Sequence, residues 1–123
     1  AEMRGNETDI IYHGNLDSVR TYNHIDDAIT AYWLCYLCGK PGEIYNIGGD
    51  ETCTVGNALD MLIKASRHRN LIKSVDPARV RPTDITLQVP CSQKFREASG
   101  WKTTKGLKDI CLDLLDYWRQ ELS

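Results

Sequence analysis

Arginines with polar neighbours are the residues of this sequence whose types and spacing best suit a binding site. Arg20 follows the turn residues 14–17, while Arg81 and Asp84 fall in the distant, proline-punctuated stretch 79–84. The planar guanidinium of arginine matches phosphate oxygens, so two arginines that converge from distant segments suit a diphosphate. A carboxylate three positions beyond Arg81 could accept hydrogen bonds from ribose hydroxyls, and the intervening proline stiffens the turn. The alternative is a loop whose charged side chains are only solvated.

The cysteines and histidines do not form a comparable pattern. Cys35 and Cys38 have C-x-x-C spacing, but a structural zinc site needs four ligands and the sequence offers no second closely spaced pair. Both thiols also fall in an apolar helical stretch, where cysteine behaves as a small hydrophobe. The histidines, His13, His24 and His68, are scattered. The sequence therefore predicts neither a metal site nor a nucleophilic triad.

Composition bounds the class of protein. The 123 residues carry 15 Lys and Arg against 17 Asp and Glu, a formal net charge of −2. This balance suits one globular α+β domain and argues against a general nucleic-acid binder, which would be strongly basic. No apolar run approaches the roughly 20 residues of a membrane span. Five cysteines, an odd number without a secretory signal, predict free thiols in a reducing compartment, the cytoplasm.

Hydrophobic periodicity predicts the elements that position the arginines. Strands are expected at 10–13, 19–25, 43–47 and 71–75, and helices at 28–38, 55–63, 93–99 and 107–122. The first helix is apolar on nearly every side, which is typical of a buried helix, and Asp26 or Asp27 is its expected N-cap. Residues 43–47 form the clearest strand pattern. The stretch between 77 and 90 is expected to be irregular because it holds three prolines.

Five short motifs, in this order along the chain, resemble the C-terminal part of extended short-chain dehydrogenase/reductase enzymes that act on nucleotide sugars. The motifs are Gly14-Asn15-Leu16-Asp17-Ser18-Val19-Arg20, His24-Ile25-Asp26-Asp27-Ala28, Pro41-Gly42-Glu43-Ile44-Tyr45-Asn46-Ile47-Gly48-Gly49, Arg81-Pro82-Thr83-Asp84 and Gly100-Trp101-Lys102. Within that superfamily the first and fourth most resemble the GDP-mannose 4,6-dehydratase family. The resemblance implies that residues 1–123 are a nucleotide-sugar-binding C-terminal domain. It would have short strands, about four helices and no Rossmann half.

The resemblance also implies roles for individual residues. Arg20 and Arg81 would clamp the diphosphate, Asp84 would meet the ribose, and Asn15 and Leu16 would lie beside the base. No catalytic or cofactor-binding residue would lie in this chain. The sequence departs from the family pattern at two positions, where Thr21 replaces an aspartate and Thr103 replaces a proline.

Tyr36 and Lys40 have the Tyr-x-x-x-Lys spacing of the family's catalytic pair, but Gly39 interrupts the helix that the pair requires. We interpret this match as a coincidence. The family's catalytic residues and its NADP or NAD site would belong to an N-terminal half, which this chain lacks.

The resemblance thus predicts part of a cytoplasmic, homo-oligomeric lyase that converts GDP-mannose to GDP-4-keto-6-deoxymannose. The alternatives are a GDP-4-keto-6-deoxymannose reductase or another nucleotide-sugar epimerase or dehydratase. An alternative of another class is a catalytically dead, stand-alone binding module.

Overall fold

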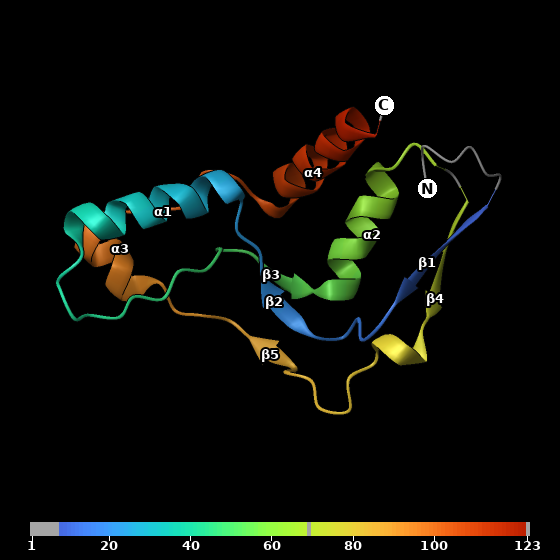
Figure 1. The fold of residues 1–123 in the computed structure, drawn as a ribbon, viewed down its shortest axis with the longest axis horizontal. Coiled ribbons are helices and arrows are strands. Elements are labelled where there is room, and N and C mark those ends of the chain that lie inside the picture. The colour runs from blue at the N-terminus through green and yellow to red at the C-terminus, as the bar shows by residue number, and fades with distance from the viewer. Residues whose placement is uncertain (1–7, 69, 123) are drawn as a thin grey trace.

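The computed structural model describes residues 8–68 and 70–122, which form an elongated arrangement of helices and short strands (Figure 1). The α+β class expected from the sequence is confirmed. The strands are β1 (Asp9–His13), β2 (Val19–Thr21), β3 (Thr52–Thr54), β4 (Leu71–Val75) and β5 (Leu87–Gln88). The helices are α1 (Ile25–Cys38), α2 (Val55–Ala65), α3 (Gln93–Ser99) and α4 (Leu107–Glu121), with a 3-10 turn at Pro77–Arg79. None of the described helices is long and apolar enough to cross a membrane.

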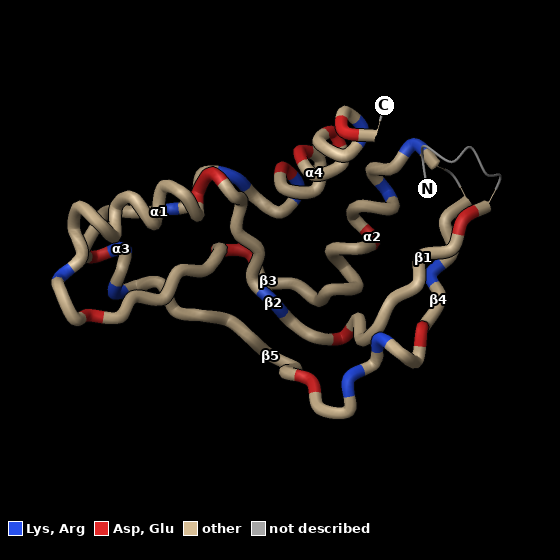
Figure 2. Tube along the Cα trace, viewed as in Figure 1, with Lys and Arg blue, Asp and Glu red and all other residues tan. Residues whose placement is uncertain are grey.

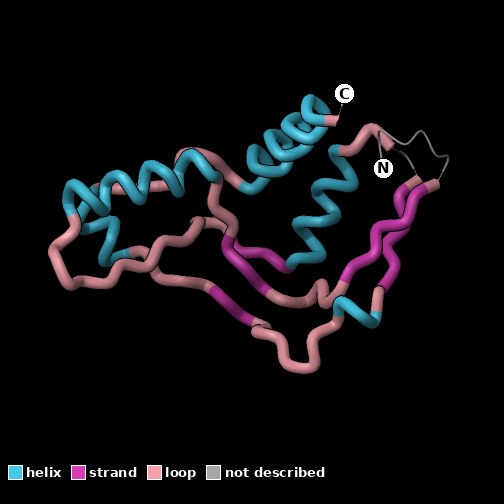
Figure 3. The backbone as a smooth tube through the Cα atoms, in the orientation of Figure 1, coloured by secondary structure: helices cyan, strands magenta, loops and turns pink. Residues whose placement is uncertain are grey.

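The strands form two small sheets, one near the middle of the molecule and one at the end opposite α1 and α3 (Figure 3). β1 pairs with β4 in parallel and packs beside α2 and α4, while β2 lies between antiparallel β3 and parallel β5. In the second sheet Val19 is opposite both Thr54 and Leu87. This pairing brings the segment before β5 next to the segment before β2. The predicted strand at 19–25 is therefore confirmed for its first three residues only.

Most helix boundaries follow the sequence signals. Thr54 caps α2, its side chain accepting a hydrogen bond from the Asn57 amide at 3.0 Å. Gly100 ends α3 in the left-handed conformation, with φ of 70°. Ser92 precedes α3 as expected, but its hydroxyl accepts from the Gly48 amide at 2.8 Å instead of capping the helix. The 3-10 turn and β5 lie within the stretch predicted to be irregular.

The predicted N-cap of α1 is wrong. The cap is His24, whose Nδ1 accepts a hydrogen bond from the Asp26 amide at 3.1 Å. Histidine is an uncommon cap, so the sequence gives little signal for it. Its other ring nitrogen lies 3.1 Å from the Asp113 carboxylate on α4, so this cap also links α1 to α4.

Asp27 is buried and ties α1 to the segment that precedes α4. Its carboxylate accepts the Thr104 amide at 3.0 Å, the Thr104 hydroxyl at 2.6 Å and the Lys105 amide at 3.2 Å. Its backbone carbonyl accepts the Trp101 indole N–H at 3.0 Å. Burial alone would raise the pKa of Asp27, but the hydrogen bonds from Thr104 and Lys105 outweigh it and lower the pKa.

A small aromatic core holds α1 against α3. Ala31 of α1, Phe95 of α3 and Trp101 are buried, and the Phe95 and Trp101 rings lie 5.8 Å apart. Tyr45 and Ile47 from the 39–50 connection pack against this cluster. At the other end of the molecule α2 packs against α4 (Figure 1).

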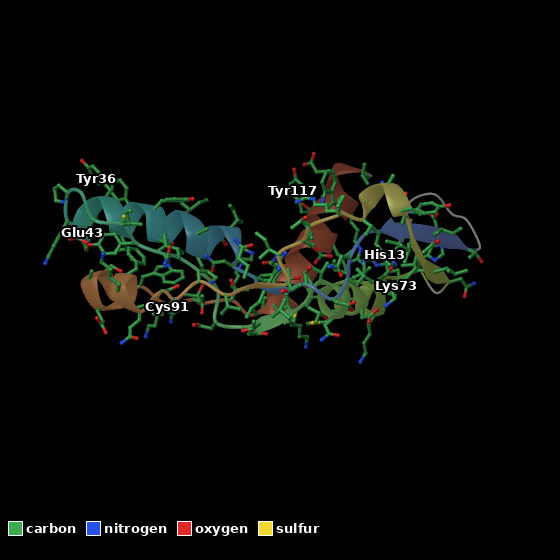
Figure 4. The ribbon with its side chains drawn as sticks, turned by 90° about the horizontal axis from the view of Figure 1, so that it is seen from below. His13, Tyr36, Glu43, Lys73, Cys91 and Tyr117 are labelled. Atoms are coloured by element: carbon green, nitrogen blue, oxygen red, sulfur yellow. The ribbon has the colours of Figure 1, made fainter. Side chains whose placement is uncertain are left out.

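The side of α1 that faces away from α3, here called its outward side, is exposed. This corrects the prediction that the helix is buried. Its exposed large apolar residues are Ile25, Ile29, Tyr32, Trp33, Tyr36 and Leu37. Tyr36 is 79% exposed and projects from the side of α1 opposite α3 (Figure 4). This apolar side is suited to burial, but the described residues do not cover it.

Residues 43–47 are not a strand, although they carry the clearest strand pattern in the sequence. Tyr45 and Ile47 face the aromatic core, while Ile44 is 82% exposed. The Ile44 carbonyl accepts from the Lys94 ammonium at 2.9 Å. No described strand pairs with this segment. A strand requires a partner for its amides and carbonyls, and propensity cannot supply one.

We predict that Asp27→Asn destabilises the chain by about 2 kcal/mol, because an amide nitrogen would face backbone or hydroxyl donors. The lowered pKa of Asp27 also has a pH consequence. Its ionised form stabilises the fold above the ordinary aspartate pKa of about 3.9, and this contribution is lost as the pH falls through the lower folded-state pKa.

Chemical denaturation between pH 2 and pH 7 measures both effects. The variant should lose this acid-dependent part of the unfolding free energy, whereas the exposed control Asp17→Asn should retain it. Equal acid sensitivity in Asp27→Asn and the unsubstituted chain would contradict the assignment.

Candidate functional site

A polar cavity lies where the turn before β2 meets the segment between β4 and β5. It has a volume of about 290 Å³ and opens to solvent. Its lining residues are Gly14, Asn15, Ser18, Arg20, Val55, Arg79, Arg81 and Asp84. Lys and Arg positions occur on both segments (Figure 2). The parallel pairing of β2 with β5 brings these distant parts of the chain together.

The Asp84 carboxylate is the centre of the hydrogen bonds at this cavity. Its Oδ2 accepts from the side-chain Nδ2 of Asn15 at 2.7 Å and from the Ser18 hydroxyl at 2.7 Å. Its Oδ1 lies 3.7 Å from Nη2 of Arg20. The hydrogen bond from Ser18, followed by that from Asn15, keeps the pKa of Asp84 below its usual value. The site therefore holds a fixed, ionised carboxylate at neutral pH.

Arg20 is held with part of its guanidinium free. Nη1 donates to the Val19 carbonyl at 2.8 Å, and Nη2 faces Asp84 without reaching hydrogen-bond distance. The side chains of Arg20 and Asp84 are each 24% exposed. A partly buried guanidinium with unused donors is suited to an anion in the cavity.

Two more arginines come from the segment between β4 and β5. The Arg79 Nε donates to Asp76 at 3.0 Å, and Asp76 also accepts the Ala78 amide at 3.0 Å. The Arg81 side chain is exposed and has no hydrogen bond or ion pair with any described residue. Both guanidinium groups thus keep donors available, and three arginines around one cavity give it a positive potential.

A close backbone approach sets the shape of the cavity wall. A Cβ at Gly14 would lie 2.4 Å from the Arg79 carbonyl oxygen, so only glycine lets these segments approach this closely. The turn that follows is closed by a hydrogen bond from the Asp17 amide to Asn15 Oδ1 at 2.8 Å. The Leu16 carbonyl accepts the Gly56 amide at the start of α2 at 2.9 Å.

Four of the five predicted site residues line the cavity: Asn15, Arg20, Arg81 and Asp84. Leu16 does not, and its backbone instead contacts the start of α2. Sequence reasoning did not select Ser18 or Arg79 as site residues. Arg79 is two positions before Arg81, so its basic charge was a usable signal. Ser18 lies inside the first of the five motifs, but its residue type alone does not mark it as a site residue, because its contact is with Asp84, 66 positions away.

The chemistry of this lining suits a phosphate ester that carries hydroxyl groups. Guanidinium groups bind phosphate oxygens, and an ionised carboxylate accepts hydrogen bonds from a diol. No group of three or more His, Cys, Asp or Glu side chains that could hold a metal ion occurs within residues 8–68 and 70–122. A second cavity of about 270 Å³, between α2 and α4, is lined mainly by leucine, isoleucine and Trp118; Arg119 is the one charged residue among its described lining residues, and none of these is a carboxylate.

Comparison with known proteins gives a consistent result. The family model described as GDP-mannose 4,6 dehydratase matches residues 1–114. The GDP-mannose 4,6-dehydratase of Sinorhizobium fredii is 22% identical over 94% of this chain and 37% of its own length. The human dTDP-D-glucose 4,6-dehydratase is 27% identical over 88% of this chain and 32% of its own. The GDP-6-deoxy-D-mannose reductase of Pseudomonas aeruginosa is 21% identical over 89% of this chain and 36% of its own length.

Solved structures show the same fold. RMD from Pseudomonas aeruginosa, in complex with NADPH, superposes with a TM-score of 0.84 and 18% identity over 97% of this chain and 38% of that one. The UDP-glucose 4-epimerase of Thermotoga maritima, with UDP-glucose, superposes with a TM-score of 0.79 and 24% identity. The match covers 99% of this chain and 38% of that one. The chain corresponds to the C-terminal part of such enzymes and spans little more than a third of their length.

We predict that Gly14→Ala pushes the 76–84 segment away from the turn, because the new Cβ would meet a backbone oxygen that cannot rotate aside. The expected cost is about 1–3 kcal/mol of unfolding free energy. Thermal melting of the variant and of the exposed-site control Glu97→Ala measures it. A melting temperature equal to that of the unsubstituted chain would show that the close approach is not required.

Proposed function

As the chain belongs to the GDP-mannose 4,6 dehydratase family, we propose that it is the nucleotide-sugar-binding portion of an enzyme that converts GDP-mannose to GDP-4-keto-6-deoxymannose. The observation that carries this proposal is the cavity in which Arg20 and Arg81 meet around an ionised Asp84. Three arginines and one carboxylate match the diphosphate and the ribose of a nucleotide sugar. The mostly apolar cavity between α2 and α4 has a single arginine, Arg119, and no carboxylate among its described lining residues.

The residues take the following roles. Arg20 and Arg81 bind the diphosphate from opposite segments, and Arg79 adds a third guanidinium at the rim. Asp84 accepts hydrogen bonds from the ribose through Oδ1, because Oδ2 is already occupied by two donors. Asn15 and Leu16 lie on the turn that would flank the base. By gripping the nucleotide, these residues would hold the sugar in position for chemistry performed elsewhere.

The reaction itself would depend on a nicotinamide cofactor, NADP or NAD, which accepts and returns a hydride when bound. We assign its site to a dinucleotide-binding domain outside this chain. A nicotinamide cofactor is supported by two solved structures, RMD with NADPH and the UDP-glucuronic acid 4-epimerase of Bacillus cereus with NAD. This chain's own part is to bind and orient the nucleotide sugar, so the isolated chain is expected to be inactive.

A reductase that acts on GDP-4-keto-6-deoxymannose is the second candidate. The reductase relative matches a similar share of the chain, and the cavity would serve both enzymes because both bind a GDP-sugar. The base is the same in the two cases, so nucleotide binding cannot separate them. A stand-alone binding module is less well supported, because the exposed apolar side of α1 suits burial against another domain.

The outward side of α1 and the unpaired segment 43–47 are the surfaces that we assign to that dinucleotide-binding domain. Trp33 and Tyr36 stack with ring centroids 5.7 Å apart on the exposed side. Segment 43–47 is adjacent to α1 along the chain and has the sequence of a buried strand. A sheet that adds this segment as a strand would satisfy its backbone groups while burying the α1 aromatics.

We predict that Arg81→Ala weakens GDP binding about tenfold or more, since it removes charge-assisted hydrogen bonds to phosphate. Arg81 has no partner among the described residues, so the melting temperature should not change. Isothermal titration calorimetry with GDP, UDP and CDP measures affinity and base preference. Lys102→Ala, which removes an exposed charge away from the cavity, is the control. Equal GDP affinity for Arg81→Ala and the control would exclude the diphosphate assignment.

We also predict that Tyr36→Gln leaves the melting temperature of the chain unchanged but impairs its association with a separately produced dinucleotide-binding domain of the family. Tyr36 is 79% exposed and contributes little to the chain's own core. The matched control is Tyr45→Gln, which should lower the melting temperature because Tyr45 packs against Phe95. Unimpaired association of Tyr36→Gln, measured by analytical ultracentrifugation, would place the interface elsewhere.

A further inference from the structure

We propose that Ser18 is a positioning residue of the nucleotide site, holding the Asp84 carboxylate so that one oxygen faces the ribose. This inference rests on the proposed function and adds a residue that was not among the predicted site residues. Ser18 is 2% exposed, so its hydroxyl is shielded from water. It donates to Asp84 Oδ2 at 2.7 Å and accepts from the Asn15 amide at 3.0 Å.

The backbone of Ser18 is fixed independently of its side chain. Its carbonyl accepts the Val55 amide at the start of α2 at 3.0 Å. The next residue, Val19, pairs with both neighbouring strands of the second sheet. A hydroxyl on so constrained a backbone can direct Asp84, whereas a hydroxyl on a mobile loop would only follow it.

Two donors on a single oxygen determine how the carboxylate can be used. Ser18 and Asn15 both occupy Oδ2, which stops the carboxylate from turning. Oδ1 then stays towards the cavity and Arg20, at 3.7 Å from Nη2. Without Ser18, Oδ2 would keep one donor, and the carboxylate could rotate and turn Oδ1 away from the ribose. That rotation would remove the ribose acceptor and leave the phosphate-binding arginines in place.

A positioning role for Ser18 affects binding of the ribose but not of the phosphates, whereas a merely structural role would affect both. GDP carries both a diphosphate and a ribose, while inorganic pyrophosphate carries only the phosphates. Ser18→Ala should weaken GDP binding about tenfold, the loss of one hydrogen bond to a charged group, and leave pyrophosphate binding unchanged. The effect on GDP should grow as the pH falls from 7 to 4, because Ser18 helps to keep the pKa of Asp84 low. The ligand phosphate titrates equally in the experiments with the unsubstituted chain and with Ser18→Ala, so its effect cancels in the ratio of their GDP affinities.

The experiment is calorimetry of the 123-residue chain and its variants with GDP and with pyrophosphate. Ser18→Thr, which keeps the hydroxyl, should restore GDP affinity, and Ser74→Ala is the control for loss of a serine away from the cavity. If Ser18→Ala does not fold, Ser18→Cys replaces it, with similar volume and a weaker donor. Circular dichroism confirms that each variant is folded.

Three outcomes would overturn the inference, and they are distinguishable. Unchanged GDP affinity in folded Ser18→Ala or Ser18→Cys excludes the positioning role alone. Equal weakening for GDP and pyrophosphate shows that Ser18 acts only by supporting the fold of the site. If the unsubstituted chain binds neither probe, or if Arg81→Ala binds both as well as the unsubstituted chain does, the proposed function fails and the role of Ser18 fails with it.

Discussion

The Asp84 carboxylate is the interaction on which the site depends, because it joins two segments that are far apart in the chain. Hydrogen bonds from Asn15 and Ser18 hold it against the turn before β2. The parallel pairing of β2 with β5, and the absence of a side chain at Gly14, allow these two segments to lie close together. Three arginines then surround one cavity without contributing to the core. The binding chemistry is thus built on a small sheet, while helix packing elsewhere supplies the stability.

A second carboxylate, in the first turn of α1, has an equivalent task. Asp27 binds the segment before α4 through three hydrogen bonds, and the aromatic core holds α1 to α3. Together these contacts fix one side of α1 and leave the other apolar side exposed. A chain that spans little more than a third of its relatives' length is expected to show such surfaces, because the dinucleotide-binding domain that we propose would cover them.

The sequence was most informative where the signal is local. Thr54 and Gly100 mark helix ends through their own chemistry, and the spacing of apolar residues located α2 and α4. It was least informative where a partner decides the outcome. Segment 43–47 has strand propensity but no neighbouring strand among the described residues. Arg20, Arg81 and Asp84 are predicted from residue type and family pattern, whereas the contact between Ser18 and Asp84 is seen only in the folded chain.

The central claim is that a nucleoside diphosphate binds between the turn before β2 and the segment before β5. Amide NMR spectra recorded during a titration with GDP test it most directly. The account predicts the largest shifts at residues 14–20 and 79–84, with small shifts in α4 and around Trp118. Shifts concentrated between α2 and α4, or around Thr103 and Thr104, would contradict it, as would an unchanged spectrum at saturating GDP.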